Sequence, residues 1–223
     1  MHRMRDPNRT VLSHSGLSIL DDCPRCFWLK YKQGIEWPEG FASRLPNRLD
    51  GILKRYFDRF REAGTLPPLL AGKVQGTLQK PFQEKYYLDH NERYRFYGKL
   101  DECLILPDGL HVPVDHKTTS SDPRGKAPHP AYQKQLDAYS WLLEANGKKI
   151  AGFGLLLFYY PDEVESIETG FPFVIQMVQL QTSPAQAKKR FLRGVEILEA
   201  PLPALTPSCD FCQYTQTLSK INE

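Results

Sequence analysis

Two aspartates and a lysine carry the clearest chemistry in this sequence. Asp101 ends the run G-K-L-D, and Asp115, His116 and Lys117 follow one another as D-H-K. Carboxylates and a backbone carbonyl such as that of His116 are oxygen ligands for Mg²⁺ or Mn²⁺, ions that make a bound water more acidic. Lys117 shares a strand face with Asp115 and would bring an ammonium to growing negative charge. These residue types predict metal-dependent phosphodiester hydrolysis.

A β-hairpin is expected to bring the two carboxylates together. Residues 93–106 alternate apolar side chains for much of their length, which predicts one strand, and residues 111–116 are expected to form the next. The pair Asp108-Gly109 between them is a strong turn signal. With this turn, residue 101 lies roughly opposite residue 116, so both carboxylates share one rim of the sheet.

Helices and further strands should surround this hairpin. We expect Ser15, Asn47 and Pro130 to mark the starts of three helices, and Ser183-Pro184 the start of a fourth. The expected helices span residues 16–31, 48–63, 130–146 and 184–198, and two more strands span 152–160 and 173–181. The first cysteine pair interrupts the segment 16–31, and Pro24 is a candidate break in that helix. The uniformly apolar strand 152–160 is expected at the middle of the sheet. The predicted class is α/β, with a mixed central sheet flanked by helices.

A third motif follows the first two. Gln135 and Tyr139 stand four residues apart, so they share one face of the helix at 130–146. The succession G-x-x-D, D-x-K and Q-x-x-x-Y resembles the RecB-like branch of the PD-(D/E)XK nucleases. The resemblance implies a restriction-endonuclease-like core of helix, three strands, helix and strand, covering roughly half of the chain.

The resemblance also implies roles for the motif residues. It implies that Asp101 and Asp115 hold Mg²⁺ or Mn²⁺, that the His116 carbonyl contributes to the same ion, and that Lys117 assists catalysis. Gln135 and Tyr139 would reach toward DNA or the metal; alternatively they are a polar surface residue and an amphipathic core contact.

Lys54 departs from the family pattern. In these nucleases an earlier helix often supplies a His or Glu to the metal, and Lys54 occupies that place. A protonated lysine cannot ligate a metal. Three alternatives stay open: Asp50, Asp58 or another acid substitutes, the site works with fewer protein ligands, or catalysis is lost.

Two C-x-x-C pairs stand at opposite ends of the sequence, Cys23 with Cys26 and Cys209 with Cys212. Four thiolates would form a metal staple joining the termini over the core. Spacing alone favours Zn²⁺, which commonly takes two such pairs. Related nucleases of the AddB type and the CRISPR-associated Cas-four type bind a 4Fe-4S cluster through one early and three late cysteines. That resemblance favours the cluster, although the third late cysteine would fall near Leu218 and is missing.

Composition sets the remaining limits. Hydrophobic residues make up 41% and charged residues 25% of the 223 residues, as in soluble globular proteins, and no apolar run is long enough for a membrane span. The first nine residues are basic with no apolar stretch after them, so we expect no secretory signal and a cytoplasmic protein. The net charge of +3 permits a nucleic-acid partner without requiring one. We expect one domain, 1–223, with a core at about 47–182 and cysteine-bearing segments at 12–34 and 200–216.

The leading hypothesis is a metal-dependent DNA nuclease, with RecB-like exonuclease or end-processing activity in DNA repair, recombination or CRISPR adaptation. Its expected partners are single strands or duplex ends of DNA, with a helicase or CRISPR integration proteins. A second hypothesis is a nuclease-like module that binds DNA without cutting it, which Lys54 favours. A thiol redox or metal-handling protein ranks last, because the C-x-x-C pairs lack a thioredoxin-like βαβ context.

Overall fold

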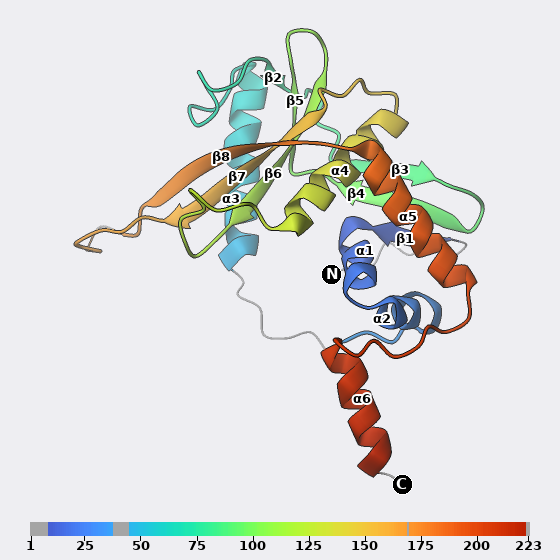
Figure 1. Cartoon of the computed structure of the whole chain (residues 1–223). Helices are drawn as coiled ribbons and strands as arrows, with labels where there is room; N and C mark the ends of the chain where they lie inside the picture. Colours follow the sequence, from blue (N-terminus) through green and yellow to red (C-terminus); the bar gives the residue numbers. More distant parts are fainter. Residues whose placement is uncertain (1–8, 38–44, 169, 222–223) are drawn as a thin grey trace. The chain divides into compact units, whose positions relative to one another are not determined.

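The computed structural model describes residues 9–37, 45–168 and 170–221 (Figure 1). The chain divides into two compact units, and each is built from separate stretches of sequence. The first unit takes its residues from Met1–Phe41, Tyr87–Tyr97 and Gln186–Glu223, and the second from Ala42–Tyr86 and Gly98–Ala185. The expectation of a single domain stays a prediction.

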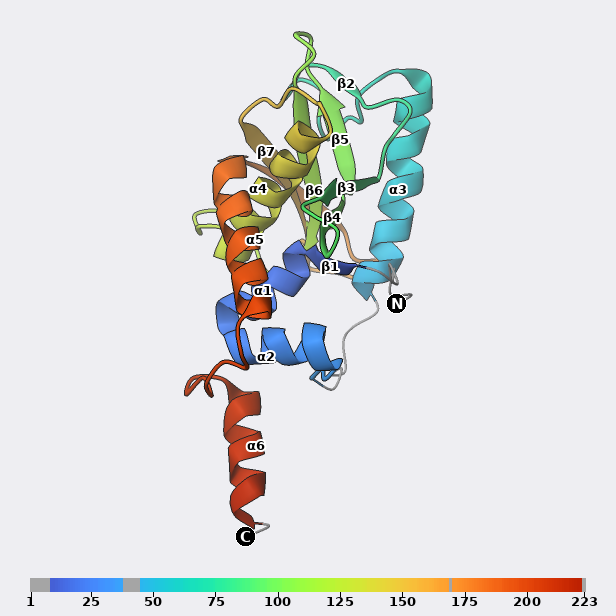
Figure 2. The same cartoon turned by 90° about the vertical axis from the view of Figure 1, so that its right-hand side faces the viewer.

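A five-stranded mixed sheet forms the centre of the second unit, in the order β2-β5-β6-β7-β8. Only β6 and β7 run parallel, and their neighbours pair antiparallel. The strands are β2 (Thr77–Leu78), β5 (Glu102–Ile105), β6 (His111–Thr118), β7 (Phe153–Pro161) and β8 (Phe173–Gln181). Figure 2 shows α3 (Leu45–Ala63) and α4 (Pro130–Ala145) on opposite sides of this sheet. The expected α/β class with a mixed sheet flanked by helices is confirmed.

The strand β7 is buried on both faces from Gly154 to Tyr160, as its uniform apolar sequence predicts. Phe57 of α3 packs in the core cluster of the sheet with residues of β5, β6 and β7. On the α4 side, a Cβ at Gly154 would lie 3.0 Å from the Leu136 side chain, so the helix packs directly on the strand. Both helices therefore have a fixed position against the strands that carry the motifs.

A smaller sheet, β1-β4-β3, lies in the first unit apart from its residues 85–86 and 98–99, which belong to the second unit. Its strands β1 and β4 run parallel. The strands are β1 (Thr10–Ser13), β3 (Lys85–Asp89) and β4 (Tyr94–Lys99), and the helical segments of the first unit are α1 (His14–Asp22), α2 (Pro24–Trp28), η1 (Leu29–Gln33), α5 (Pro184–Glu199) and α6 (Asp210–Ile221). Phe191 of α5 lies edge-on to Phe96 of β4 at 5.4 Å. The absence of a side chain at Gly194 lets α5 approach Leu17 and Phe27.

The strand expected at 93–106 is two strands in two sheets. β4 ends at Lys99 and β5 begins at Glu102, and between them the Leu100 N–H donates to the Glu84 carbonyl at 2.8 Å. The chain passes here from the three-stranded sheet to the five-stranded sheet. The alternation of apolar residues continues across this point, so it cannot show where one strand ends and the next begins. The hairpin itself is formed by β5 and β6, around the predicted turn.

The helix expected at 16–31 is interrupted. α1 ends before Cys23, whose side chain accepts from the Cys26 N–H and so starts α2 with Pro24 in its first turn. The cap of α1 is Ser13, not Ser15, because the Ser13 hydroxyl accepts from the Gly16 N–H. Asn47 likewise is not the N-cap of α3, since the helix already includes Leu45.

The predicted ends of several other helices and strands agree more closely with the structure. α4, β8 and α5 have nearly the predicted bounds, and Gly34 and Gly64 follow their helices with positive φ angles of 70° and 68°. The elements β1, β2, β3 and α6 were not predicted. No helix in the described ranges is long and apolar enough to cross a bilayer.

Candidate active site and cysteine centre

Asp101 and Asp115 meet at one end of the β5–β6 hairpin. The ladder pairs Glu102 with Val114, so Asp101 and Asp115 occupy the next positions along it, one residue away from the predicted register. The His116 N–H donates to Asp101 Oδ2 at 3.0 Å. Asp115 is buried with 1% of its surface exposed, whereas Asp101 is partly exposed. The hairpin therefore presents one carboxylate at the surface and one just beneath it.

The buried carboxylate of Asp115 contacts two other motif residues. Lys117 Nζ lies 2.5 Å from Asp115 Oδ2, and Gln135 Nε2 donates to Asp115 Oδ1 at 2.9 Å. Despite the nearby ammonium, Oδ2 accepts no well-aligned hydrogen bond from the described residues. Burial raises the pKa of Asp115 to about 7, although the Lys117 charge opposes this rise. This oxygen is suited to a cation that would stabilise its ionised form.

Gln135 connects the D-x-K motif to Tyr139 of its own motif, and Gly98 of G-x-x-D lies against the same helix. Gln135 Oε1 accepts from Lys117 Nζ at 2.9 Å, and Gln135 Nε2 also donates to the Tyr139 hydroxyl at 2.7 Å. A Cβ at Gly98 would lie 2.4 Å from Leu142 and 3.5 Å from Tyr139, so only glycine lets α4 pack this close to the end of β4. The glycine of G-x-x-D therefore has a packing role.

The His116 side chain points into the core side of the sheet. Its ring lies 4.9 Å from the Phe57 ring, and its Nδ1 is 3.1 Å from the Tyr159 hydroxyl. Burial lowers the pKa of His116 to about 4, so the ring is neutral near neutral pH. The ring is thus a packing group here, and ligation through the His116 carbonyl stays a prediction.

Lys54, at the place where the family often has a metal-binding His or Glu, forms ion pairs with acidic residues. Its Nζ is 3.1 Å from Asp50 Oδ2 and 3.3 Å from Glu84 Oε1, and Lys99 Nζ is 2.9 Å from the same Glu84 oxygen. Burial alone would raise the pKa of Glu84, but the Lys99 and Lys54 ammonium groups lower it. Phe57, three residues after Lys54 on α3, lies 4.9 Å from the His116 ring, so this face of α3 is turned toward the motif residues.

Glu84 is the charged neighbour that sequence reasoning missed, since it belongs to no motif. The other suggested substitute, Asp58, pairs with Arg61 Nε at 3.2 Å and is largely exposed.

Arg61 and Glu102 form a buried ion pair directly beside Asp101. Arg61 Nη2 donates to Glu102 Oε2 at 2.5 Å, and Arg61 Nη1 donates to the Gln79 carbonyl at 2.8 Å. Glu102 is 1% exposed and is the residue after Asp101. This pair ties the end of α3 to β5, and so limits where the Asp101 backbone can lie.

The donor set of this site fits a hard divalent ion. Asp101 and Asp115 offer two carboxylates from adjacent strands, and Mg²⁺ is commonly held by one or two carboxylates with several waters. Apart from the cysteines, no group of three or more His, Cys, Asp and Glu atoms in the described ranges gathers closely enough to form a full cage. The site therefore suits an ion that keeps water and can still bind a phosphate.

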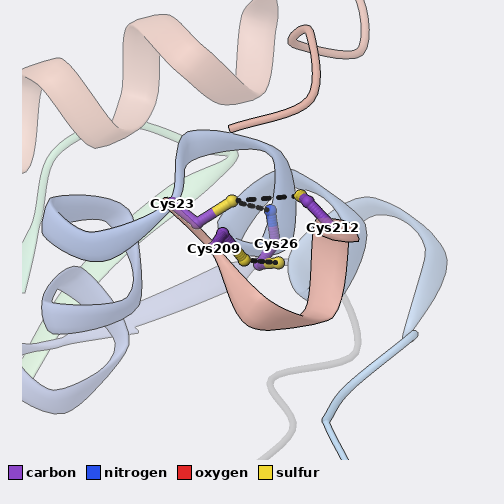
Figure 3. A group of neighbouring side chains, drawn as sticks. All are labelled: Cys23, Cys26, Cys209 and Cys212. Atoms are coloured by element: carbon purple, nitrogen blue, oxygen red, sulfur yellow. Dashed lines mark hydrogen bonds between the residues drawn. The ribbon is translucent and has the colours of Figure 1, made fainter. Parts of the chain in front are cut away.

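Four cysteines form a separate cluster within the first unit (Figure 3). Cys23 and Cys26 come from the α1–α2 junction, and Cys209 and Cys212 from the start of α6. All four side chains are buried, and the pKa of Cys212 is raised by burial and by the neighbouring thiols. Cys103 is buried in β5, in the other unit. The expected cluster of the two C-x-x-C pairs is confirmed.

Comparisons with known proteins give a family profile and a similar solved structure. The profile of the PD-(D/E)XK nuclease superfamily matches residues 45–217. The crystal structure of SSO0001 is similar at a TM-score of 0.47 and 18% sequence identity, over 91% of this chain and 81% of that chain. No curated protein matches the sequence.

Proposed function

Because this chain belongs to the PD-(D/E)XK nuclease superfamily, we propose that it hydrolyses DNA phosphodiesters with Mg²⁺ or Mn²⁺, as a RecB-like exonuclease or end-processing nuclease. One observation carries the proposal: Asp115, Lys117 and Gln135 form a single network of contacts beneath Asp101. Four charged or polar groups from two strands and a helix would be costly to gather in a site without function. DNA is the substrate class of the family.

Each residue has a distinct part in the proposed reaction. Asp101 and Asp115 would hold the divalent ion, which would supply a more acidic water and neutralise phosphate charge. The Lys117 ammonium lies beside Asp115, where it can stabilise negative charge on the scissile phosphate. Gln135 fixes that ammonium by accepting from it at 2.9 Å. Tyr139 in turn fixes Gln135 through its hydroxyl.

Lys54 is compatible with catalysis in this proposal. Its ammonium is already paired with Asp50 and Glu84, so it neutralises two acids and is not a metal ligand. The site then works with fewer protein ligands than usual in the family. Asp115 Oδ2, which accepts no well-aligned hydrogen bond from the described residues, supports this alternative.

The biological setting follows from the RecB-like resemblance. We propose single strands or duplex ends as substrate, in DNA repair, recombination or CRISPR adaptation, with a helicase or integration proteins as partners in the cytoplasm. The four-cysteine centre, which lies in the first unit, would be structural and take no part in hydrolysis.

A nuclease-like module that binds DNA without cutting is the second candidate. The observation in its favour is that Lys54 occupies the place of a usual ligand and lies next to Asp50, the nearest substitute acid on α3. An ammonium there would weaken metal binding by repulsion.

The deciding experiment compares the full chain with Asp115→Asn on end-labelled single-stranded and duplex DNA, with and without Mg²⁺ or Mn²⁺. Asp108→Asn, at the turn of the same hairpin, is the matched control. We expect ion-dependent cleavage by the wild type and the control, and a loss of at least about 10²-fold in Asp115→Asn. DNA that is bound but stays intact in every condition would overturn the nuclease proposal in favour of the binding module.

A second substrate tests the exonuclease part of the proposal. Circular single-stranded DNA has no ends, so a RecB-like exonuclease should leave it intact while it degrades the linear form. Cleavage of the circle at a similar rate would mean that internal bonds are the substrate.

A further inference from the structure

The sulfur atoms of the four-cysteine centre lie close together. Cys23 Sγ is 3.7 Å from Cys212 Sγ, and Cys26 Sγ is 3.5 Å from Cys209 Sγ. All four sulfurs lie within 4.8 Å of one another. Each close contact joins a cysteine of the α1–α2 junction to one at the start of α6, as Figure 3 shows. The four sulfur atoms therefore form one compact group, and not two separate pairs.

This spacing is that of ligands around one ion. Zn–S bonds of about 2.3 Å in a tetrahedron place the sulfurs about 3.8 Å apart, which agrees with both short contacts. In a 4Fe-4S cluster each thiolate binds a different iron at a corner of a cube, which separates the sulfurs by roughly 6 Å. The four sulfurs as they lie leave no room for the cube. The cluster favoured by the family resemblance does not fit this set.

The surroundings of the sulfurs also suit a fixed ion. The Cys26 N–H points at Cys23 Sγ from 3.3 Å, and Trp37 Nε1–H donates to Cys26 Sγ at 3.4 Å. Thr206 Oγ1 lies 3.2 Å from Cys23 Sγ. Such contacts delocalise the negative charge of metal-bound thiolates and hold their orientation. Further toward the surface, Trp37 and Phe211 stack at 5.2 Å beside the sulfurs.

We propose that Cys23, Cys26, Cys209 and Cys212 hold a single structural Zn²⁺ and no iron-sulfur cluster. Thiolate sites bind Zn²⁺ more tightly than Fe²⁺ in the usual order of divalent metals, and four protein ligands close the coordination sphere. The ion cross-links two segments of the first unit that are far apart in sequence. This inference is independent of the proposed nuclease activity.

Metal analysis of the full chain tests the inference directly. The protein is produced in medium that contains both iron and zinc, purified without oxygen, and assayed for zinc, iron and acid-labile sulfide. We expect one zinc per chain, a colourless protein and no sulfide. Iron and sulfide at about four per chain would overturn the inference in favour of the cluster. One iron without sulfide, or four free thiols in folded protein without metal, would overturn it equally.

Three cysteine variants separate a loss of zinc binding from a loss of the fold. Cys212→Ser should lower zinc affinity by more than about a hundredfold, because loss of an outer-shell partner alone costs about 10- to 100-fold. Cys212→His should keep the zinc, since Cys₃His is also a tetrahedral zinc set. Cys103→Ser, which changes the cysteine outside the cluster, is the control and should keep full zinc content.

Cobalt gives a readout that does not depend on activity. Co²⁺ reconstituted into the metal-depleted chain should show the intense visible bands of tetrahedral thiolate coordination, at one ion per chain. Bands of an octahedral ion, or uptake unchanged in Cys212→Ser, would show that the four thiolates do not form the site.

Discussion

The Lys117 side chain is held on several sides. Its ammonium lies between Asp115 Oδ2 at 2.5 Å and Gln135 Oε1 at 2.9 Å, and 5.2 Å from the centre of the Tyr132 ring. A lysine side chain loses much rotamer entropy when it is fixed in this way. Such preorganisation is useful if the ammonium must meet a phosphate without moving.

Replacement of Lys117 should therefore affect the rate more than metal binding. We expect Lys117→Ala to lower kcat by about 10²- to 10³-fold, the usual cost of losing one preorganised charge. The Mg²⁺ concentration for half-maximal binding, measured by calorimetry, should not rise, because the substitution removes a cation from beside the Asp115 carboxylate. Lys73→Ala, an exposed lysine of the same unit, is the control. Equal losses in both variants would contradict a role at the phosphate.

Lys54 is expected to weaken metal binding without preventing it. Lys54→Met removes an ammonium near the motif residues, releases Asp50 from its ion pair and leaves Glu84 paired with Lys99 alone. We expect the apparent Mg²⁺ affinity to rise on the order of tenfold, since a unit charge at about 10 Å is worth roughly 1.7 kcal/mol at an effective dielectric constant of about 20.

The control for Lys54 is Arg55→Met, which removes an exposed cation from the next position of α3. Metal titrations of the cleavage rate should separate the two variants. An unchanged or lower Mg²⁺ affinity in Lys54→Met would mean that this ammonium does not act on the ion.

At the scale of elements, Arg61 adds a buried polar attachment of the end of α3 to the sheet. Arg61 contacts Glu102 of β5 and the Gln79 carbonyl, and its guanidinium lies 4.4 Å from the centre of the Phe82 ring. Removal of the cation would leave the Glu102 carboxylate buried without its partner. The attachment is thus sensitive to a single substitution.

We expect Arg61→Met to lower the free energy of unfolding by about 3–5 kcal/mol, the usual cost of breaking a buried ion pair. Arg59→Met, on the exposed side of the same helix, should cost less than about 1 kcal/mol. Denaturant unfolding of the full-length variants gives both values. A loss in Arg61→Met as small as that in the control would contradict the proposed attachment.

The start of β6 should make stability depend on pH. Burial lowers the pKa of His111, although hydrogen bonds to backbone groups oppose this effect, and its Nδ1 has no partner among the described residues. A histidine with a lowered pKa in the folded state adds stability above its unfolded pKa of about 6.5, and this contribution is lost as the pH falls.

His111→Gln should therefore flatten the fall in unfolding free energy below about pH 6.5. The comparison is made by denaturant titrations at a series of pH values, with His90→Gln, an exposed histidine, as control. The interpretation fails if the wild type and His111→Gln lose stability in parallel.

At the scale of the whole molecule, two chemistries reside in different units. The carboxylate site lies in the second unit, and the thiolate centre joins early and late segments of the first. Hard oxygen ligands and soft sulfur ligands select different metals, so both sites can be filled from one mixture of ions. The chain can thus use one metal for chemistry and another for structure.

Removal of the zinc should loosen the first unit selectively. After treatment with a thiol-directed mercurial, we expect faster amide hydrogen exchange in α1, α2 and α6, because they lose their shared ion. Exchange in β5, β6 and β7 should stay unchanged. The Cys103→Ser variant is used throughout, so that modification of that thiol cannot explain the result. Uniformly faster exchange would contradict a local structural role.

The sequence alone determined the features that depend on neighbours along the chain. Residues two apart on a strand share a face, so Asp115 and Lys117 were predicted to lie together, and they do. Residues four apart on a helix share a face, so Gln135 and Tyr139 were paired correctly, and they contact each other at 2.7 Å. The ends of α4 also followed from local signals, because Pro130 and Gly147 favour the start and the stop of a helix.

Only the tertiary structure decided the contacts between distant segments. The break between β4 and β5 at Leu100 depends on the hydrogen bond that Leu100 donates to the Glu84 carbonyl, in the connection between β2 and β3. The ion pair of Lys54 with Glu84 depends on how α3 packs. The spacing of the cysteine sulfurs likewise follows from where the two C-x-x-C pairs meet. Local periodicity carries no information about such distances, because they are set by the packing of whole elements against one another.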